Sequence, residues 1–385
     1  MKTLKYIWRN VMRNKLRSML TILSVGFSLA LMTILYGYMA MQDQWGIEAS
    51  KHHRIVVMST QGFSGTVPIG IVDRVRSMDG VKAAVPYSWY GGTYKDQQMA
   101  FAQFGTDPKH VFDVWSEFTI APEQLNAFQE NRQACVADRR LAERMKWNIG
   151  DRIPLEGTFF DYNLDLTLVG VFDSPKTTDS LWFNWNYLDE GLRSQSSVSA
   201  GNAGTVFAKT TDASTIANVC KAIDDRFSSS DTPTRTQTES AFAQMFADML
   251  GNIRAYIFNI GLAVVFSLSL VATNAMAMSM RERTTEVAVL KAIGFSKTRV
   301  LWLVLGESCW IAMLGGLLGI GLGCLFLEGL HAMNAQFFPF SVREMAGPWL
   351  LLLLATAAGI GIASGLVPAI RAAQLSVVDG LRRVI

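Results

Sequence analysis

The chain has 385 residues, of which 50% are hydrophobic and 17% are charged, and its formal net charge is +3. Soluble domains usually carry about 25% charged residues, so the composition argues against an ordinary soluble enzyme. The near-neutral total combines two opposed parts, because residues 43–253 hold 26 acidic and 19 basic residues whereas the rest of the chain holds 6 and 16.

Four long apolar stretches, each nearly free of charge, dominate the sequence. A bilayer core about 30 Å thick needs about 20 helical residues at 1.5 Å each, and every stretch reaches that length. We therefore predict an α-helical membrane protein with four transmembrane helices and one large extracytoplasmic domain between the first and the second. The predicted spans cover residues 18–42, 254–280, 300–328 and 348–370.

The segment before the first span is strongly basic. Residues 1–17 contain six Lys or Arg and no acidic residue, and their apolar residues recur at helical spacing, which predicts an amphipathic helix at the cytoplasmic interface. A cleaved signal peptide is the alternative. The apolar run is longer than the 7–15 residues or so of a signal peptide and no A-x-A-like site follows it, so we expect a retained helix.

Basic residues also predict the orientation, because they concentrate on the cytoplasmic side of membrane proteins. They gather in residues 1–17, the link 281–299 and the tail 371–385, whereas the link 329–347 has a single arginine. We therefore expect both termini in the cytoplasm of a bacterial inner membrane and residues 43–253 outside it. Since topology accounts for these clusters, no nucleic-acid partner is expected.

The outer segment mixes strand-like and helix-like runs, which predicts a mixed α+β domain. The polar tract 228–238 is expected to be a loop. Strands are expected over Arg54–Met58, Val81–Pro86, Asp165–Phe172 and Thr205–Lys209, and helices over Ile69–Met78, Glu123–Phe128, Ala137–Met145, Ser214–Phe227 and Glu239–Arg254.

Aromatic residues and cysteines of this domain leave two questions open. The aromatic groups at 89–94 and 182–187 are either a partner-binding surface or packed core, and we favour core because aromatic side chains bury large areas. Cys135 and Cys220 could form a disulfide, although their spacing does not decide it. The four histidines show no spacing typical of a metal site.

The third and fourth spans carry small residues four positions apart, a spacing that places them on one helix face and lets helix backbones approach closely. Glu307 is the carboxylate most clearly inside a span. For Glu307 we favour a structural role, bonding a neighbouring helix or a water, over ion translocation. The small residues are Gly315, Gly319 and Gly323 in the third span and Ala357, Gly361 and Gly365 in the fourth.

The link between the second and third spans reads R-E-R-T-T-E-V-A-V-L-K-A-I-G-F-S from residue 281 to 296. It predicts a short amphipathic helix that places Val287, Leu290 and Ile293 on one face and ends at Gly294. From these residues alone, a plain connector is an equally good interpretation.

The same link resembles the signature R-x-x-E-x-x-x-L-[RK]-A-x-G-x-S of the MacB/FtsX-like ABC transporter permeases. Glu286, Leu290, Lys291, Ala292, Gly294 and Ser296 match it. Five further segments resemble motifs of the same family: L-G-E-S at 305–308, G-G-L-L-G at 315–319, P-A-I-R-A-A at 368–373, V-D-G-L-R at 378–382 and N-K-L-R-S-M-L-T at 14–21. Weaker hallmarks of the family's periplasmic domain are G-T-D-P at 105–108 and L-A-E to G-D over 141–151.

This resemblance implies a type VII, mechanotransmission permease, in which ATP-driven movement passes along the helices to the outer domain. It implies a second permease subunit, the same or homologous, and allows a periplasmic adaptor. Residues 239–280 can form one helix about 63 Å long at 1.5 Å per residue, which would carry the movement outward. The resemblance also implies a cytoplasmic ATPase dimer docked at Glu286, Leu290, Lys291, Ile293 and Gly294.

No G-x-x-x-x-G-K-[ST] motif occurs in the sequence. We therefore expect ATP to bind a separate subunit and expect this chain to hold no cofactor, metal or catalytic residue. The expected output is efflux of a substrate or extraction of lipoproteins or lipids. Regulation of a periplasmic cell-wall hydrolase is an alternative, which the large outer domain disfavours, and a membrane sensor without transport is another.

Overall fold

The computed structural model describes residues 15–95, 97–98, 100–175, 178–249, 253–333 and 340–378. The predicted interfacial helix over residues 1–17 therefore lies almost entirely outside the described residues, and so does half of the predicted tail. The chain divides into two compact units, one of Met1–Gln44 with Leu250–Ile385 and the other of Trp45–Met249.

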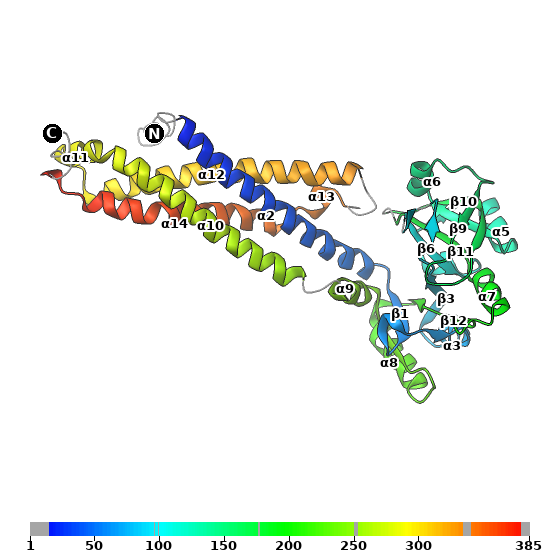
Figure 1. The fold of residues 1–385 in the computed structure, drawn as a ribbon. Coiled ribbons are helices and arrows are strands. Elements are labelled where there is room, and N and C mark those ends of the chain that lie inside the picture. The colour runs from blue at the N-terminus through cyan, green and yellow to red at the C-terminus, as the bar shows by residue number, and fades with distance from the viewer. Residues whose placement is uncertain are drawn as a thin grey trace. The chain divides into compact units, whose positions relative to one another are not determined.

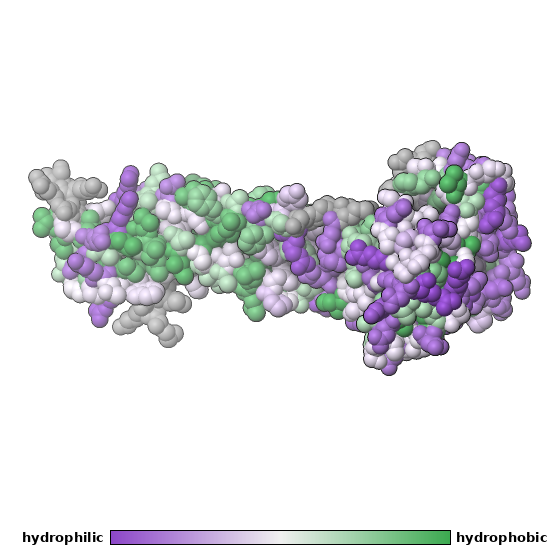
Figure 2. Space-filling view, turned by 90° about the horizontal axis from the view of Figure 1, so that it is seen from below, coloured by the Kyte–Doolittle hydropathy of each residue, from purple (hydrophilic) through white to green (hydrophobic). Residues whose placement is uncertain are grey.

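The first unit is built from four long helices whose apolar surface is plain in Figure 2. All four are long and apolar enough to cross a membrane, which confirms the predicted fold class. Each runs past its predicted span, because hydropathy marks the apolar part of a helix and not its ends. The helices are α2 (Lys15–Ser50), α10 (Ile253–Glu282), α12 (Lys297–Met333) and α14 (Pro348–Gln374), with the short α11 (Thr284–Ala292) and α13 (Val342–Met345).

Glycines bring α12 into backbone contact with two neighbouring helices. On the side of α2, a Cβ at Gly319 would overlap the carbonyl oxygen of Gly26. On the side of α14, a Cβ at Gly361 would lie 2.7 Å from the Cα of Cys309. The other small-residue positions Gly315, Gly323 and Gly365 are similarly enclosed, against Val25, Thr33 and Ser308.

The second unit, which corresponds to the predicted extracytoplasmic domain and is called the outer unit below, contains a mixed sheet (Figure 1). Among the described residues this sheet has ten strands, in the order β14-β1-β13-β3-β6-β11-β8-β10-β7, and β9 also pairs with β10. Most pairs are antiparallel, but β10 with β8 and β11 with β6 are parallel. The strands are β1 (Arg54–Ser59), β3 (Val81–Trp89), β6 (Ala102–Thr106), β7 (Thr119–Ile120), β8 (Ala134–Asp138), β9 (Arg152–Leu155), β10 (Leu164–Asp173), β11 (Ser180–Asn184), β13 (Thr205–Thr210) and β14 (Thr234–Thr238).

Helices cover both faces of this sheet. Along β1, Ile55 and Val57 pack on one face while Val56 packs on the other, as the two-residue period of a strand requires. The helices are α3 (Gly70–Arg76), α4 (Val111–Val114), α5 (Pro122–Glu130), α6 (Arg139–Met145), α7 (Trp185–Ser194), α8 (Ile216–Phe227) and α9 (Glu239–Met249), and two small two-stranded sheets pair β2 (Val67–Pro68) with β12 (Asn202–Ala203) and β4 (Thr93–Tyr94) with β5 (Gln97–Gln98).

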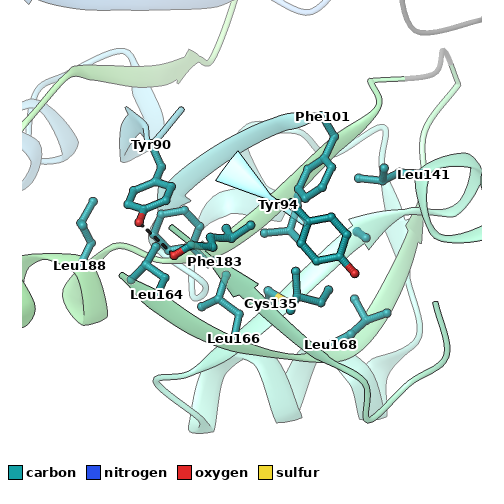
Figure 3. Packing of buried hydrophobic residues seen from close by; sticks show 14 of the residues in the cluster. Tyr90, Tyr94, Phe101, Cys135, Leu141, Leu164, Leu166, Leu168, Phe183 and Leu188 are labelled. Atoms are coloured by element: carbon teal, nitrogen blue, oxygen red, sulfur yellow. Dashed lines mark hydrogen bonds between the residues drawn. The ribbon is translucent and has the colours of Figure 1, made fainter. Parts of the chain in front are cut away.

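Most of the predicted aromatic groups belong to the packed core. Tyr90 and Phe183 are completely buried and meet edge to face at 6.0 Å (Figure 3). The Tyr90 hydroxyl donates to the Tyr162 carbonyl at 2.6 Å, so its polar end is satisfied inside the core. Trp89 is the exception, at 43% exposure. The prediction of core is therefore right for most of these residues.

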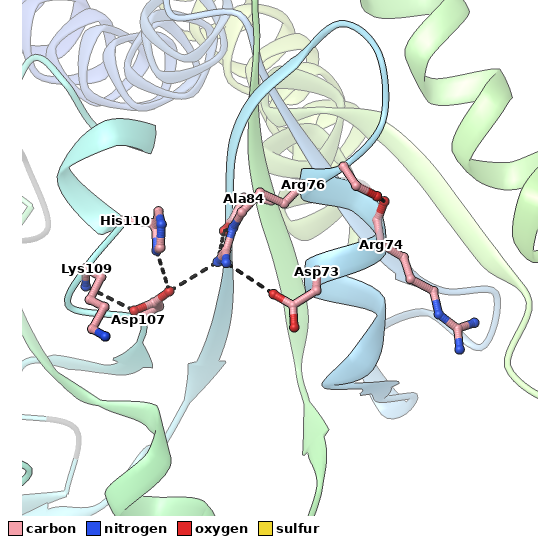
Figure 4. Close-up of polar contacts among 8 residues, drawn as sticks. Asp73, Arg74, Arg76, Ala84, Asp107, Lys109 and His110 are labelled. Carbon is pink, nitrogen blue, oxygen red and sulfur yellow. Dashed lines mark hydrogen bonds and ion pairs between the residues drawn. The ribbon is translucent and has the colours of Figure 1, made fainter.

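The G-T-D-P motif of the outer unit has a structural role. Asp107, from the G-T-D-P motif, accepts the His110 ring nitrogen at 2.8 Å and the Arg76 guanidinium at 3.1 Å, as Figure 4 shows. Arg76 also donates to the Ala84 carbonyl. The motif therefore ties α3 and β3 to the start of α4, which explains its place in the fold without a ligand.

A buried arginine ties the first strand of the outer unit to its last helix. Arg54 Nε donates to Glu239 Oε2 at 2.6 Å, Arg54 Nη1 also pairs with Glu117, and the guanidinium lies 5.5 Å from the ring centre of Trp115. The second oxygen of Glu117 is buried without a hydrogen-bond partner in the described part of the chain and lies 3.7 Å from His52 Nδ1. Arg54, Glu239, Glu117 and His52 therefore form one cluster of interacting ionisable groups.

The predicted loop over 228–238 is wrong in its second half. Residues Thr234–Thr238 form β14, which pairs with β1. Threonine is a β-branched residue suited to strands, and the hydroxyls of Thr234 and Thr236 both donate to Asp224, at 3.0 and 2.7 Å. The polar composition therefore reflects a strand whose hydroxyls are bonded to a neighbouring helix.

Two predicted helices also differ from the structure. The helix expected over Ala137–Met145 begins at Arg139, because Ala137 and Asp138 complete β8 and the Asp138 side chain caps the helix. Residues 239–280 contain two helices, α9 and α10. Residues 250–252 between them lie outside the described part, so the single long helix stays a prediction.

Candidate docking site around helix α11

Helix α11 follows directly from the end of α10 and closes with a glycine. Gly294 has φ of +103°, a conformation that glycine adopts without strain. The amide of Phe295 donates to the Leu290 carbonyl and that of Gly294 to the Lys291 carbonyl, which is the Schellman pattern. A Cβ at Gly294 would meet nothing within 4 Å. Glycine is therefore favoured here by the positive φ of the backbone and not by a lack of space.

The beginning of α11 is fixed to helix α12 by a buried ion pair. Arg283 Nη1 donates to both carboxylate oxygens of Glu307, at 3.0 and 2.9 Å, and Arg283 Nε donates to Glu286 at 3.2 Å. The Glu307 side chain is 9% exposed and that of Arg283 17%. Burial lowers the pKa of the Arg283 guanidinium, but the two carboxylates raise it more, so the net shift is upward and Arg283 stays charged.

The end of α11 is fixed to the end of α14 by a lysine. Lys291 Nζ donates to the carbonyls of Ala373 and Leu375, at 2.7 and 2.6 Å. These carbonyls belong to the last turn and the C-cap of α14, where backbone oxygens lack helical partners and attract cations. Partial burial, and then Lys297, lower the pKa of the Lys291 ammonium.

The two sides of α11 differ in exposure. Val287 is buried against α12 and α14, in a cluster that includes Val300 and Ala369, and Ala288 is also completely buried. Three apolar side chains of α11 and of the turn that follows it are exposed, and we call them the docking face: Val289 at 43%, Ile293 at 72% and Phe295 at 37%. Figure 1 places α11 at the same end of this unit as the beginning of α2.

The structure divides the five predicted docking residues. Ile293 lies on the docking face, Gly294 follows it in the turn that ends the helix, and Leu290 is half-buried. Glu286 and Lys291 are engaged within the chain, through Arg283 and the end of α14. Val289 and Phe295 were not predicted, because the sequence argument placed the apolar face on Val287, Leu290 and Ile293, whereas Val287 packs inward.

The arrangement can bind a protein surface and fix it to three membrane helices. It brings together no nucleophile with a base, and the part of the chain that the structure describes has no group of three or more His, Cys, Asp or Glu side chains placed to hold a metal. An exposed apolar face on a short helix braced at both ends is typical of a protein contact.

Comparison with known proteins covers both units. Residues 18–226 match the family model of the MacB-like periplasmic core domain, and residues 258–377 match that of the FtsX-like permease C-terminal domain. The macrolide export ATP-binding/permease protein MacB of Neisseria meningitidis serogroup A is 25% identical over 96% of this chain, and the chain spans 59% of that relative.

Two further proteins are similar to this chain. An uncharacterized ABC transporter permease of Methanocaldococcus jannaschii is 24% identical over 98% of this chain and 96% of its own length. Among solved structures, the periplasmic region of MacB from Actinobacillus actinomycetemcomitans is 12% identical, covering 52% of this chain and 93% of that one, with a TM-score of 0.38.

Proposed function

This chain belongs to the MacB/FtsX-like ABC transporter permeases, and from that premise we propose that it transmits ATP-driven movement of a separate ATPase to its outer domain. ATP would be bound by an ATPase dimer on the cytoplasmic side, and this chain would hold no cofactor. A second permease subunit, the same or homologous, would complete the complex.

The docking face carries the proposal. Ile293 is 72% exposed yet sits directly before Gly294 in a turn with fixed hydrogen bonds, so its position is set without a partner. A preformed apolar anchor loses little conformational freedom on binding. An ATPase groove that receives Ile293 and Val289 would bury both side chains.

The braces around α11 support transmission of movement. Arg283 links the start of α11 to Glu307 in α12, and Lys291 links its end to α14. A push on α11 would therefore reach α12 and α14, and it would reach α10 through the chain itself. This is the behaviour expected of a mechanical linkage, and it requires no conduction of substrate between the helices.

Relatives named for macrolide export and for pyoverdine export favour efflux of a substrate as the output. Extraction of lipoproteins or lipids would use the same linkage. Regulation of a cell-wall hydrolase and a sensor without transport are the alternatives. The basic residues near the membrane ends support inner-membrane placement with cytoplasmic termini.

The test is a pull-down of the tagged chain from native membranes, with mass spectrometry of the proteins that co-purify. The wild-type chain is expected to recover an ATPase with a phosphate-binding loop, and Ile293→Asp to recover at least tenfold less, because an aspartate would be buried in the groove. The control is Val378→Asp, which adds the same charge at a residue that is 74% exposed and outside the docking face.

Equal recovery of the ATPase by the Ile293 variant, or recovery of none by the wild type under conditions that preserve a control transporter, would refute the proposal. Charge reversal at Glu286 is expected to weaken ATPase coupling while leaving membrane insertion intact. The neutral Glu286→Gln change, which keeps a group able to accept from Arg283, is the milder companion variant.

A further inference from the structure

Arg54 lies where the chain enters the sheet of the outer unit, and it contacts the helix by which the chain leaves that unit. Helix α2 ends at Ser50, and Arg54 is the first residue of β1. Helix α9 follows β14 without a gap, and its first residue, Glu239, accepts a hydrogen bond from Arg54 at 2.6 Å. The segments that lead to α2 and to α10 are therefore joined by one arginine inside the outer unit.

The second half of α9 is held less firmly than its start. Phe242 still packs on the sheet, with its ring centre 5.9 Å from that of Phe207, whereas Phe246 is 50% exposed. Helix α9 ends at Met249 and α10 begins at Ile253. A displacement of α10 therefore enters the outer unit at the end of α9, and the sheet holds α9 near its start.

From Arg54 a chain of contacts leads to the interior of the sheet. Arg54 also pairs with Glu117, and its guanidinium lies 5.5 Å from the ring centre of Trp115. The Trp115 ring packs on three strands that lie inside the strand order and not at its edges. The rings that it meets are Tyr87 of β3, Trp182 of β11 and Phe207 of β13, at 5.1, 5.3 and 5.2 Å between ring centres.

The ion pairs of Arg54 are suited to carry a displacement. The Arg54 side chain is 5% exposed, and those of Glu117 and Glu239 are 14% and 18% exposed, so salt weakens these ion pairs little. The guanidinium is planar and directs its N–H groups at fixed angles. While both bonds hold, neither carboxylate can move far relative to the other.

We propose that Arg54 is the positioning residue through which the outer unit takes up movement of the membrane helices. It does so by holding α9 and the interior strands together, through Glu239 on one side and through Glu117 and Trp115 on the other. This inference rests on the proposed function, because it assigns the point at which ATP-driven movement enters the sheet. Without Arg54, α9 turns against the sheet and the movement is lost before it reaches the interior strands.

The test measures two distances by double electron–electron resonance in the full chain, assembled with its ATPase in lipid nanodiscs. The four cysteines of the chain are replaced, and the chain is spin-labelled before the ATPase is added. Labels at Met333 and Glu123 report movement between α12 and the sheet, and labels at Gln244 and Glu123 report movement of α9 against the sheet; all three residues are exposed. In the wild type, an ATP analogue that is not hydrolysed is expected to shift the first distance and to leave the second unchanged.

Arg54→Met is expected to reduce the shift of the first distance at least threefold and to introduce a shift in the second, while ATP hydrolysis stays within twofold of the wild type. A second variant adds Glu117→Gln and Glu239→Gln, so that no buried carboxylate is left unpaired, and the same result is expected. The control Arg144→Met leaves the buried carboxylate of Asp179 unpaired in another part of the outer unit. It is expected to lower the unfolding temperature without changing either shift.

The inference is overturned if both Arg54 variants shift the first distance as the wild type does, if the Arg144 control reduces that shift as much as they do, or if both Arg54 variants lose ATP hydrolysis. A wild-type complex that holds the ATPase and shifts neither distance overturns the transmission of movement itself, and this inference with it. The two failures are therefore distinguished by the wild-type measurement.

Discussion

Arg283 and Glu307, 24 residues apart, form a two-point hydrogen-bonded pair that fixes the start of α11 to the interior of α12. We expect Glu307→Ala to destabilise the chain by about 3 kcal/mol, the lower end of the cost of breaking a buried ion pair, because Glu286 remains as a partner of Arg283. The measurement is thermal unfolding in detergent.

A double variant separates charge from packing at this pair. Arg283→Met with Glu307→Leu replaces both charges by apolar groups, and such replacements are often close to neutral. We expect it to recover most of the stability lost in Glu307→Ala. If the double variant is as unstable as the single one, the pair acts through something other than its buried charge.

Two glycines of α12 provide a matched comparison of helix packing. Gly319 touches the Gly26 carbonyl, whereas a Cβ at Gly321 would meet nothing within 4 Å. Gly319→Ala is expected to cost about 1–3 kcal/mol through overpacking against a backbone, and Gly321→Ala to change the unfolding temperature little. Similar losses in both variants would contradict the assignment of Gly319 to a helix contact.

His52 predicts a pH dependence of stability. Burial lowers the pKa of His52 below its usual 6.5. Among the smaller effects, Glu117 and Glu48 raise this pKa, whereas Arg54 and Lys209 lower it. The unfolded chain therefore binds more protons than the folded one just below pH 6.5, so stability should fall as the pH falls from 7 toward 5.

His52→Asn removes this titration. The carboxylates of the outer unit, including Glu239 whose pKa is raised by burial, titrate in both proteins. The difference in unfolding temperature between variant and wild type at pH 5 and pH 7 therefore isolates His52. A difference that is the same at both pH values would contradict the prediction.

The cysteines are predicted to carry free thiols. Cys135 and Cys220 belong to different packed clusters and form no disulfide with each other. Burial raises the pKa of the Cys135 thiol far above its usual range and that of Cys220 to about 11. We expect maleimide to label Cys135 in denaturant but not in the folded chain, with no shift on a non-reducing gel.

The sequence predicts the membrane helices well because a span needs about 20 apolar residues, a signal that no short strand can produce. Strands were harder to find. Residues 134–138 read A-C-V-A-D, a run too short to tell a buried strand from the start of a helix. The strand assignment of 234–238 depends on pairing with β1, about 180 residues away.

The candidate site was predictable in location but not in its contacts. Gly294 identifies the end of α11 from sequence, since helices commonly end at glycine. The targets of Lys291 lie 82 and 84 residues away, and no local pattern indicates them. Glu307 was predicted to bond a neighbouring helix, and it bonds Arg283, which directly follows α10.

The first and last strands of the outer unit lie side by side, since Ile55 of β1 pairs with Thr238 of β14 and Arg54 bonds Glu239. A domain whose two ends lie together can be inserted into a host chain without forcing the host apart. Gene exchange between related transporters could therefore replace this domain as a unit, provided the incoming domain brings an ion pair equivalent to Arg54–Glu239. A family built on such units can change its outer specificity while its membrane helices stay the same.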